Sequence, residues 1–226
     1  MIELHSYFNR SWTSVDNMFQ GDHWYYNIRI NDYQLITIAW NLGLILVPWF
    51  FGWVIIMLYR RTGLATWWAK IFGLVLFLFW LLFIPNAIYV VSDVRHLANY
   101  CEVANKFSVC EQNVWMILFF YVYATIGWVS FVYIVNQLKN FIADVYGQLL
   151  AEVWCVLLMP FVSLGFLLGL VQRWNSWEAF MYPLNLKADI VSYTNDVHRF
   201  TNWLIFTIFL YILYWSGNVI FRPRNS

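Results

Sequence analysis

The sequence predicts an all-α protein that lies in a membrane: a polytopic integral membrane helix bundle with about five transmembrane helices and an N-terminal interfacial segment. Two observations lead to this fold class. Of the 226 residues, 62% are hydrophobic, 22% are aromatic and only 11% are charged, which is far outside the range of soluble globular domains. The hydrophobic residues also form runs long enough to cross a hydrocarbon core about 30 Å thick, which takes about 20 residues per helix. A lipid bilayer is therefore the expected environment of the chain.

The charge and the absence of familiar motifs limit the function classes. The formal net charge is +1 and there is no long basic run, whereas nucleic-acid-binding surfaces concentrate lysine and arginine. We therefore expect no nucleic-acid partner. The sequence also lacks the common phosphate-binding, zinc-protease and nucleophile-elbow motifs. It leaves open whether the protein is an enzyme and which cofactor, if any, it uses.

The N-terminal residues 1–34 are predicted to form an interfacial, extracytoplasmic segment. Charged residues such as Arg10 and Asp16 occur among many aromatic residues, and the basic start and apolar core of a secretory signal are missing. Tryptophan and tyrosine favour the membrane–water interface, because their rings are amphipathic. A partly ordered tail is the alternative interpretation.

The transmembrane domain is predicted to cover residues 35–221 and to be followed by a cytoplasmic tail at 222–226. Pro85 is expected to kink or end the second span, because proline disrupts a helix interior. Glu152 lies near the start of the fourth span, where the helix dipole favours a carboxylate, so we expect a structural role for it. The spans are expected at about 35–59, 67–85, 114–135, 149–170 and 203–221.

Basic residues predict the orientation in a plasma membrane. The short connections and the tail on one side concentrate them, whereas the other side spreads a similar number over about three times the length. The N-terminus is therefore expected outside and the C-terminus in the cytoplasm. The residues on the predicted cytoplasmic side are Arg60, Arg61, Lys70, Lys139, Arg222 and Arg224.

Two cysteines lie in the polar segment between the second and third spans. Cys101 and Cys110 are a disulfide candidate if this segment faces an oxidising compartment. Free thiols are the alternative, and a metal site would need more soft ligands than the neighbouring sequence offers.

The densest polar stretch begins at Pro85, where an apolar run turns polar. If the chain continues as a helix, four polar residues fall within about 80° of one another and Arg95 points to the opposite side. Asp93 and His96 are three residues apart, so the carboxylate can accept a hydrogen bond from the imidazole or both can bind one metal ion. Alternatively, the stretch ends a helix and its charges are solvated. The polar stripe consists of Asn86, Tyr89, Asp93 and His96.

A second motif, Arg-Trp-Asn-Ser-Trp-Glu, occupies residues 173–178. Its tryptophans are suited to headgroup depth, and Asn175 could cap a new helix with Glu178 at the third position. Arg173 is suited to a phosphate or carboxylate, because a guanidinium grips two oxygens together. The alternative for Arg173 is an internal partner such as Asp93 or Glu178, or a lipid phosphate.

Both motifs resemble those of an uncharacterised bacterial family of multi-pass membrane proteins, domain of unknown function 1361. The family reads Pro-Asn-Ala-Pro-Tyr, Thr-Asp and His-Leu, and later Arg-Trp-Asn-Ser-Trp-Asp. Here Ile88 replaces the second proline, which permits a helical continuation; Ser92 replaces threonine, and Leu170 stands where a further arginine is usual. The resemblance covers roughly residues 35–220 and implies a membrane location but no activity. The matching residues of the first motif are Pro85, Asn86, Ala87, Tyr89, Asp93, His96 and Leu97.

We expect the two motifs to meet at the outer face and to bind a small anionic or lipid-headgroup ligand, as part of an envelope-related assembly. One alternative is a membrane-embedded hydrolase or transferase, with or without a metal, that uses Asp93, His96 and Glu178 for catalysis. Another is a structural subunit bound to a membrane-protein partner. The predicted ligand-binding residues are Asn86, Tyr89, Asp93, His96, Arg173, Asn175 and Glu178.

Overall fold

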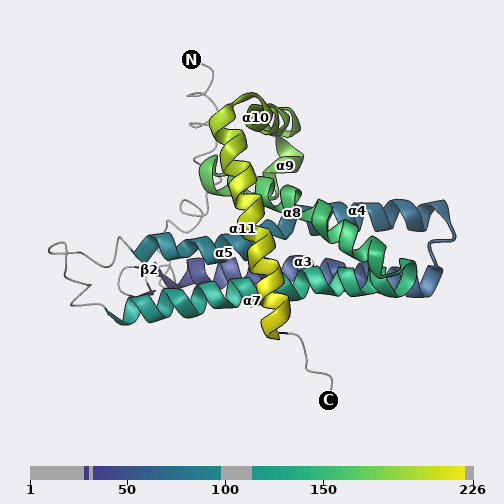
Figure 1. The fold of residues 1–226 in the computed structure, drawn as a ribbon, viewed down its shortest axis with the longest axis horizontal. Helices are drawn as coiled ribbons and strands as arrows, with labels where there is room; N and C mark the ends of the chain where they lie inside the picture. Colours follow the sequence, from purple (N-terminus) through teal and green to yellow (C-terminus); the bar gives the residue numbers. More distant parts are fainter. Residues whose placement is uncertain (1–27, 31–32, 98–113, 222–226) are drawn as a thin grey trace.

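The computed structural model describes residues 28–30, 33–97 and 114–221 (Figure 1). These residues form helices joined by short connections, together with the short strands β1 (Arg29–Ile30) and β2 (Tyr33–Gln34), which pair antiparallel. The predicted all-α fold class is confirmed. The helices are α3 (Leu35–Thr62), α4 (Trp67–Phe83), α5 (Pro85–Ser92), the 3-10 helix η2 (Asp93–His96), α7 (Trp115–Tyr146), α8 (Gln148–Val171), α9 (Glu178–Met181), α10 (Pro183–Asn195) and α11 (Val197–Phe221).

Within the described ranges, five helical segments are long and apolar enough to cross a membrane. They are α3, the stretch Trp67–His96, α7, α8 and α11. The second of these continues past Pro85, which follows the end of α4 and becomes the first residue of α5. Proline is tolerated at the start of a helix, because its missing N–H has no intrahelical partner there. Ile88, at the place of the usual second proline, is buried inside α5.

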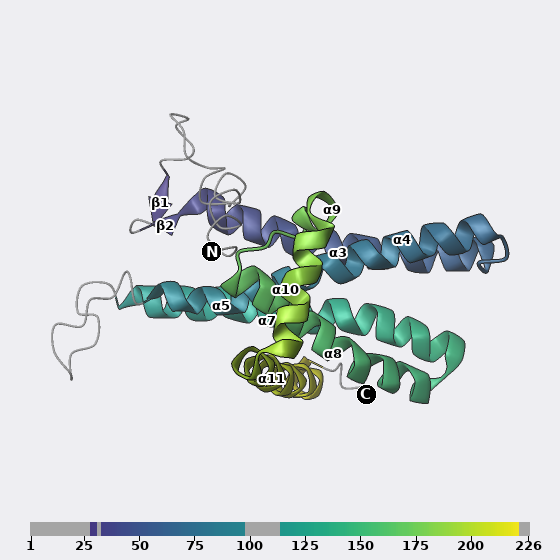
Figure 2. The ribbon, with the colours of Figure 1, turned by 90° about the horizontal axis from the view of Figure 1, so that it is seen from above.

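The helices form two antiparallel hairpins that pack around α5. Helices α3 and α4 make one hairpin, and α7 and α8 make the other; Figure 2 shows them as separate layers. Gly63 closes the first hairpin in a left-handed conformation (φ 57°), and its N–H donates to the Tyr59 carbonyl at 2.7 Å. Helix α11 crosses the second hairpin steeply and packs on both of its helices.

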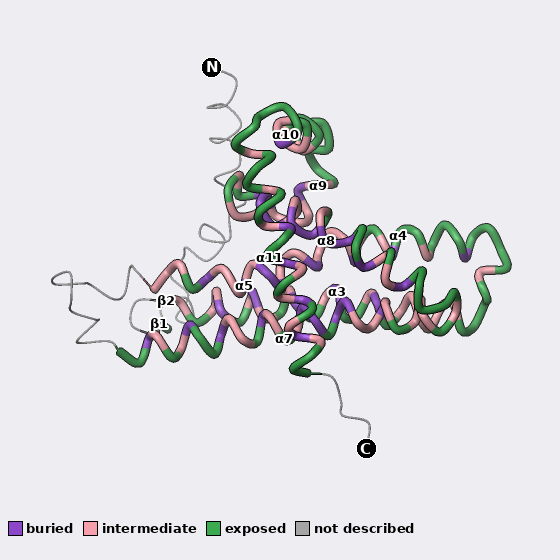
Figure 3. Tube along the Cα trace, in the orientation of Figure 1, coloured by how far each residue is buried: buried purple, intermediate pink, exposed green. Residues whose placement is uncertain are grey.

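The core lies where these helices cross (Figure 3). Trp80, Phe131, Met159 and Tyr214 are among its largest fully buried side chains and come from four different helices. The outer surfaces of the helices remain exposed and apolar, as expected for helices that face lipid. Helix association in lipid depends mainly on close packing and interhelical hydrogen bonds.

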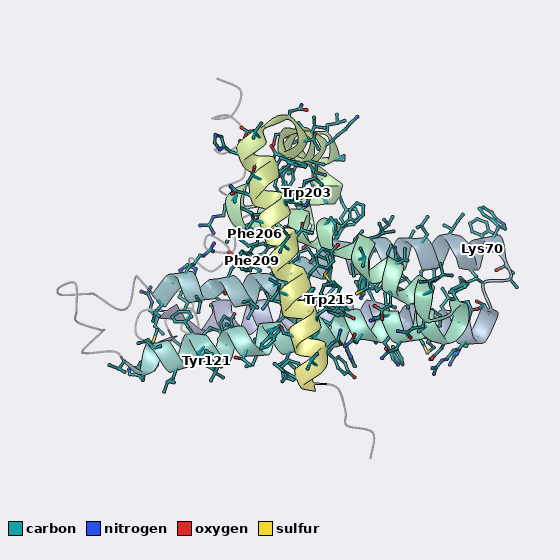
Figure 4. The ribbon with its side chains drawn as sticks, viewed as in Figure 1. Lys70, Tyr121, Trp203, Phe206, Phe209 and Trp215 are labelled. Atoms are coloured by element: carbon teal, nitrogen blue, oxygen red, sulfur yellow. The ribbon has the colours of Figure 1, made fainter. Side chains whose placement is uncertain are left out.

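Aromatic side chains attach α11 to α8 around a proline. Pro160 has no N–H, so the carbonyl of Val156 lacks its usual helical donor. The hydroxyl of Tyr211 donates to that carbonyl at 2.6 Å, and the indole of Trp203 donates to the Pro160 carbonyl at 2.8 Å. Trp203, Phe206, Phe209 and Trp215 follow one another along α11 (Figure 4). The one backbone carbonyl that the proline leaves without a helical donor is thus satisfied inside the membrane domain.

A polar connection joins the two helices of the second hairpin near their turn. The ammonium of Lys139 on α7 lies 2.8 Å from the carboxylate of Glu152 on α8. Gln148, one turn earlier on α8, also donates to Glu152 at 2.8 Å. The Glu152 carboxylate therefore links α7 to α8. This is a structural role, as its position near the start of the fourth span suggested.

Asp196 caps α11 at its junction with α10. Its Oδ1 accepts hydrogen bonds from the backbone N–H groups of His198 at 2.8 Å and Arg199 at 3.1 Å, which is an N-cap arrangement. These bonds, above all that from Arg199, lower the pKa of the Asp196 carboxyl, because they stabilise its charged form.

We expect Asp196→Ala to lower the unfolding midpoint of the micelle-solubilised protein, and Asp196→Asn to lower it less because the amide oxygen still caps. Because the pKa of Asp196 is lower in the folded state than the value of about 3.9 in the unfolded state, its charged carboxylate stabilises the fold at pH values above about 3.9. This stabilisation is lost as the pH falls through the folded-state pKa. The difference between the wild type and Asp196→Ala should therefore shrink below about pH 4. Thermal unfolding across this pH range measures it, and a difference independent of pH would contradict the charge effect.

Candidate functional site

The first motif places a buried carboxylate between two partners. Asp93 begins η2 and is only 1% exposed. Its Oδ2 accepts a hydrogen bond from the side-chain amide of Asn41 on α3 at 3.1 Å. Its Oδ1 lies 3.9 Å from Nε2 of His96, three residues later. A donor from another helix therefore holds Asp93 in place, while His96 remains partly exposed beside it.

Arg95 lies on the same side as the predicted polar stripe, which corrects the expectation that it points away. Its Nη2 donates to the hydroxyl of Tyr89 at 2.8 Å, and its Nε donates to Nε2 of His96 at 3.4 Å. The chain here follows the 3-10 helix η2, which has 3.0 residues per turn rather than 3.6. This tighter turn brings Arg95 closer to the side of the polar stripe, and its long side chain then reaches Tyr89 and His96.

The second motif forms a tight loop after α8. The backbone N–H of Asn175 donates to Oε2 of Glu178 at 2.7 Å, and the Glu178 N–H donates to the Asn175 carbonyl at 3.0 Å. The first bond is side chain to backbone and the second is a backbone turn, so together they close the loop between Asn175 and Glu178. Glu178 is fully buried (0% exposed). The expected capping of a new helix by Asn175 is therefore not formed, because α9 begins at Glu178 with Trp177 as its N-cap and has no side-chain cap; Glu178 instead closes the loop through the Asn175 N–H.

Helix α10 positions this loop. The indole of Trp174 donates to Oδ2 of Asp189 at 2.7 Å. The hydroxyl of Tyr193 donates to Oε1 of Gln172 at 3.2 Å. Burial raises the pKa of Tyr193, because an apolar environment disfavours the phenolate. The phenol therefore stays protonated and can act as a donor at neutral pH.

The two motifs contact each other directly, although 90 residues separate them. The side-chain amide of Asn86 donates to Oγ of Ser176 at 3.1 Å and to the Phe83 carbonyl at 2.9 Å. Close packing supports this contact, because a Cβ added to Gly165 on α8 would meet Cγ of Pro85 at 2.8 Å. The structure thus brings together the two stretches that the sequence singled out.

A cavity of about 730 Å³ lies between α3, α5, α8 and the loop of the second motif. All of the predicted ligand-binding residues line it except Glu178, whose carboxylate caps the loop instead. Three arginines line the cavity, and sequence reasoning missed two of them, Arg29 and Arg95. Arg29 comes from β1, in a segment whose sequence shows no ligand-binding pattern. The polar lining residues are Arg29, Gln34, Thr37, Asn41, Asn86, Tyr89, Asp93, Arg95, His96, Arg173, Asn175 and Ser176.

The charge of this lining is predominantly positive. It contains three guanidinium groups, Arg29, Arg95 and Arg173, and a single carboxylate, Asp93. Arg173 is exposed and makes no hydrogen bond or ion pair with any residue of 28–30, 33–97 or 114–221. Its backbone is left-handed (φ 59°), an uncommon conformation for a residue with a side chain. The cavity therefore offers a guanidinium without an internal partner among the described residues.

Both motifs lie within a region that matches a known protein family. A family model of proteins of unknown function, DUF1361, matches residues 40–214. The chain belongs to the DUF1361 family. Neither the curated proteins nor the solved structures contain a match to this DUF1361 protein. The helices and the family match together identify a membrane protein whose two motifs lie within the matched region.

Several sequence-based expectations fall on residues that the structure does not describe. Cys101 and Cys110 lie outside the described ranges, as do most of the N-terminal segment and the C-terminal residues 222–226 with their two arginines, for which a cytoplasmic position is predicted. Among the described residues, no three His, Cys, Asp or Glu side chains are grouped closely enough to hold a metal ion. The candidate metal ligands there remain the pair Asp93 and His96.

Proposed function

We propose that this DUF1361 protein binds a small anionic ligand or an anionic lipid headgroup in the cavity between its two motifs. The observation that carries the proposal is the lining: three arginines converge from β1, η2 and the second motif, against one carboxylate. A guanidinium binds phosphate or carboxylate through two parallel hydrogen bonds. Cavities of a few hundred to about 1,000 Å³ are typical of small-molecule sites.

The available side chains suit an anion. Arg173 has no partner among the described residues, so it can turn to a ligand without breaking an internal bond. The side chains of Asn86 and Asn175 line the same space, and the internal hydrogen bonds of their amides hold this part of the wall in place. With the N-terminus outside, this site faces the outer surface of a plasma membrane, where it would serve an envelope-related assembly.

Arg173→Gln tests the proposal. We expect this variant to bind dihexanoyl phosphatidic acid or inorganic phosphate at least about tenfold more weakly than the wild type, because a charge-assisted hydrogen bond contributes about 1.5–3 kcal/mol. Its unfolding midpoint should not fall, since Arg173 makes no contact of this kind within the described residues. Calorimetric titration of the protein in neutral detergent micelles measures both ligands.

Lys187→Gln is the matched control. Lys187 is an exposed cation on α10 and does not line the cavity, so its loss removes the same charge without touching the site. We expect this variant to bind as the wild type does. Equal binding by Arg173→Gln and Lys187→Gln would contradict the proposed site, as would the lack of saturable binding of both anions to the wild type.

A membrane-embedded hydrolase or transferase is the second candidate function. The observation that favours it is the buried Asp93 beside His96, at 3.9 Å, on the wall that carries Arg95. An imidazole close to a carboxylate can accept a proton from an attacking hydroxyl group. Glu178 does not join this pair in the cavity lining. Release of a product from a bound ester would distinguish this function from binding alone.

A further inference from the structure

We propose that the ligand is a whole anionic lipid of the surrounding bilayer, with its phosphate among the arginines and one acyl chain in the apolar end of the same cavity. This inference rests on the proposed function and extends it from a headgroup to a complete amphiphile. The evidence is a change from polar to apolar lining that occurs in the same direction on three separate elements.

Helix α3 shows the change along one face. Gln34, immediately before the helix, and then Thr37 and Asn41 line the cavity from its polar end, and Leu44 follows at the next helical position. The spacing of three or four residues keeps all of them on one side of the helix. The wall that α3 contributes is therefore polar near the N-terminus of the helix and apolar deeper inside.

The opposite walls repeat this pattern. Leu81 and Leu82 line the cavity before Pro85, and the polar residues of the first motif follow after it. On α8 the apolar lining residues Phe161 and Leu164 precede the loop that carries Arg173. Along all three walls the lining thus changes from leucine or phenylalanine residues toward one end of the cavity to polar residues at the other.

The depth of the apolar end matches one leaflet. Leu44 lies ten residues beyond Gln34, the residue immediately before α3, and Phe161 lies ten residues before the last residue of α8, Val171. At about 1.5 Å per residue, each distance is about 15 Å along the helix. This is half of a hydrocarbon core about 30 Å thick.

The apolar end is also accessible from the side. The Phe161 side chain lines the cavity and is nevertheless 61% exposed at the outer surface of α8. More than half of this side chain is thus left uncovered by the described residues, so an acyl chain can enter from the bilayer without passing through water. A water-soluble anion would use only the polar end, whereas an anionic lipid matches both the charge and the apolar depth.

Photocrosslinking tests this assignment. Phe161 is replaced by p-benzoylphenylalanine, and the protein is reconstituted into phosphatidylcholine vesicles that contain a minor fraction of phosphatidic acid. We expect the lipid adducts at position 161 to be enriched about tenfold in phosphatidic acid over the bulk membrane, the factor that one charge-assisted hydrogen bond supplies. Adding Arg173→Gln should return the adducts to the bulk composition.

Val122 provides the control position. It lies on α7, is 56% exposed and does not line the cavity. The same photoreactive residue there should give adducts of bulk composition. Position 164 provides a second cavity site in case the variant at 161 does not fold, as judged by its unfolding midpoint.

The possible outcomes separate this inference from the proposed function. Adducts of bulk composition at 161 and 164, with binding of inorganic phosphate retained, would overturn the acyl-chain assignment and leave the anion site intact. Loss of both enrichment and anion binding in the wild type would overturn both proposals. Adducts to a co-purified protein at these positions would replace the lipid by a protein occupant.

Discussion

Replacement of Gly127 by alanine is expected to destabilise the protein by about 1–3 kcal/mol. A Cβ at this position of α7 would lie 2.7 Å from the carbonyl oxygen of Ala87 and 3.0 Å from Cβ of Val90, both on α5. The oxygen belongs to the backbone, so no side-chain rotation can relieve the contact. Helices α5 and α7 would have to separate, and α5 carries the first motif.

Gly43→Ala is the matched control for Gly127→Ala. Gly43 is also in a long helix, α3, but a Cβ there meets nothing within 4 Å. We expect this variant to be unchanged or more stable by up to about 1 kcal/mol, because alanine has the higher helix propensity. Reversible unfolding by sodium dodecyl sulfate in mixed micelles compares the two. Equal stability of the two variants would show that α5 and α7 are not in close contact.

Asn41→Leu is expected to destabilise the protein by about 1–3 kcal/mol or more, because it deprives a buried carboxylate of a donor. The Asn41 amide donates to Asp93 Oδ2 at 3.1 Å, and both side chains are buried. Replacing both residues by leucine should recover most of the loss, since removing both partners leaves no buried charge behind. The same unfolding assay measures both variants.

The alternative for Asn41 is simple packing. In that case the double variant would be at least as unstable as Asn41→Leu, because two altered side chains would disturb the same contact. Asp93→Leu alone completes the cycle and gives the coupling energy between the two residues. A coupling energy near zero would mean that the hydrogen bond does not hold Asp93 in place.

Much of the fold follows from hydropathy and length. The apolar runs correspond to the candidate spans, because a helix must be long enough to cross the hydrocarbon core whatever its packing. The course of the chain after Pro85 was less predictable. Proline can end a helix or begin one, and here it begins α5, in which Ile88 is buried. Tertiary packing against α7 and α8 accompanies that continuation.

The candidate site was predictable only in part. Helical spacing grouped the polar stripe, and the two motifs were expected to meet because both were placed on the same membrane face. The position of Arg95 depends on a short 3-10 segment, and that of Arg29 depends on a strand pair of two residues each. Such short elements leave no periodicity in a sequence. For Glu178 the sequence instead allowed too many roles, because the same motif fitted both a structural carboxylate at a helix start and a catalytic residue.

The left-handed backbone of Arg173 creates a conflict between the stability of the loop, which favours glycine, and the presence of a guanidinium at the cavity. For an L-residue this conformation costs about 1–2 kcal/mol, whereas glycine adopts it freely. Arginine at this position therefore gives up loop stability for a guanidinium at the cavity. Stability-guided redesign would choose glycine here and would thereby remove the proposed anion contact, a conflict between stability and function. Position 173 is thus one to leave unchanged when the protein is stabilised for experiments.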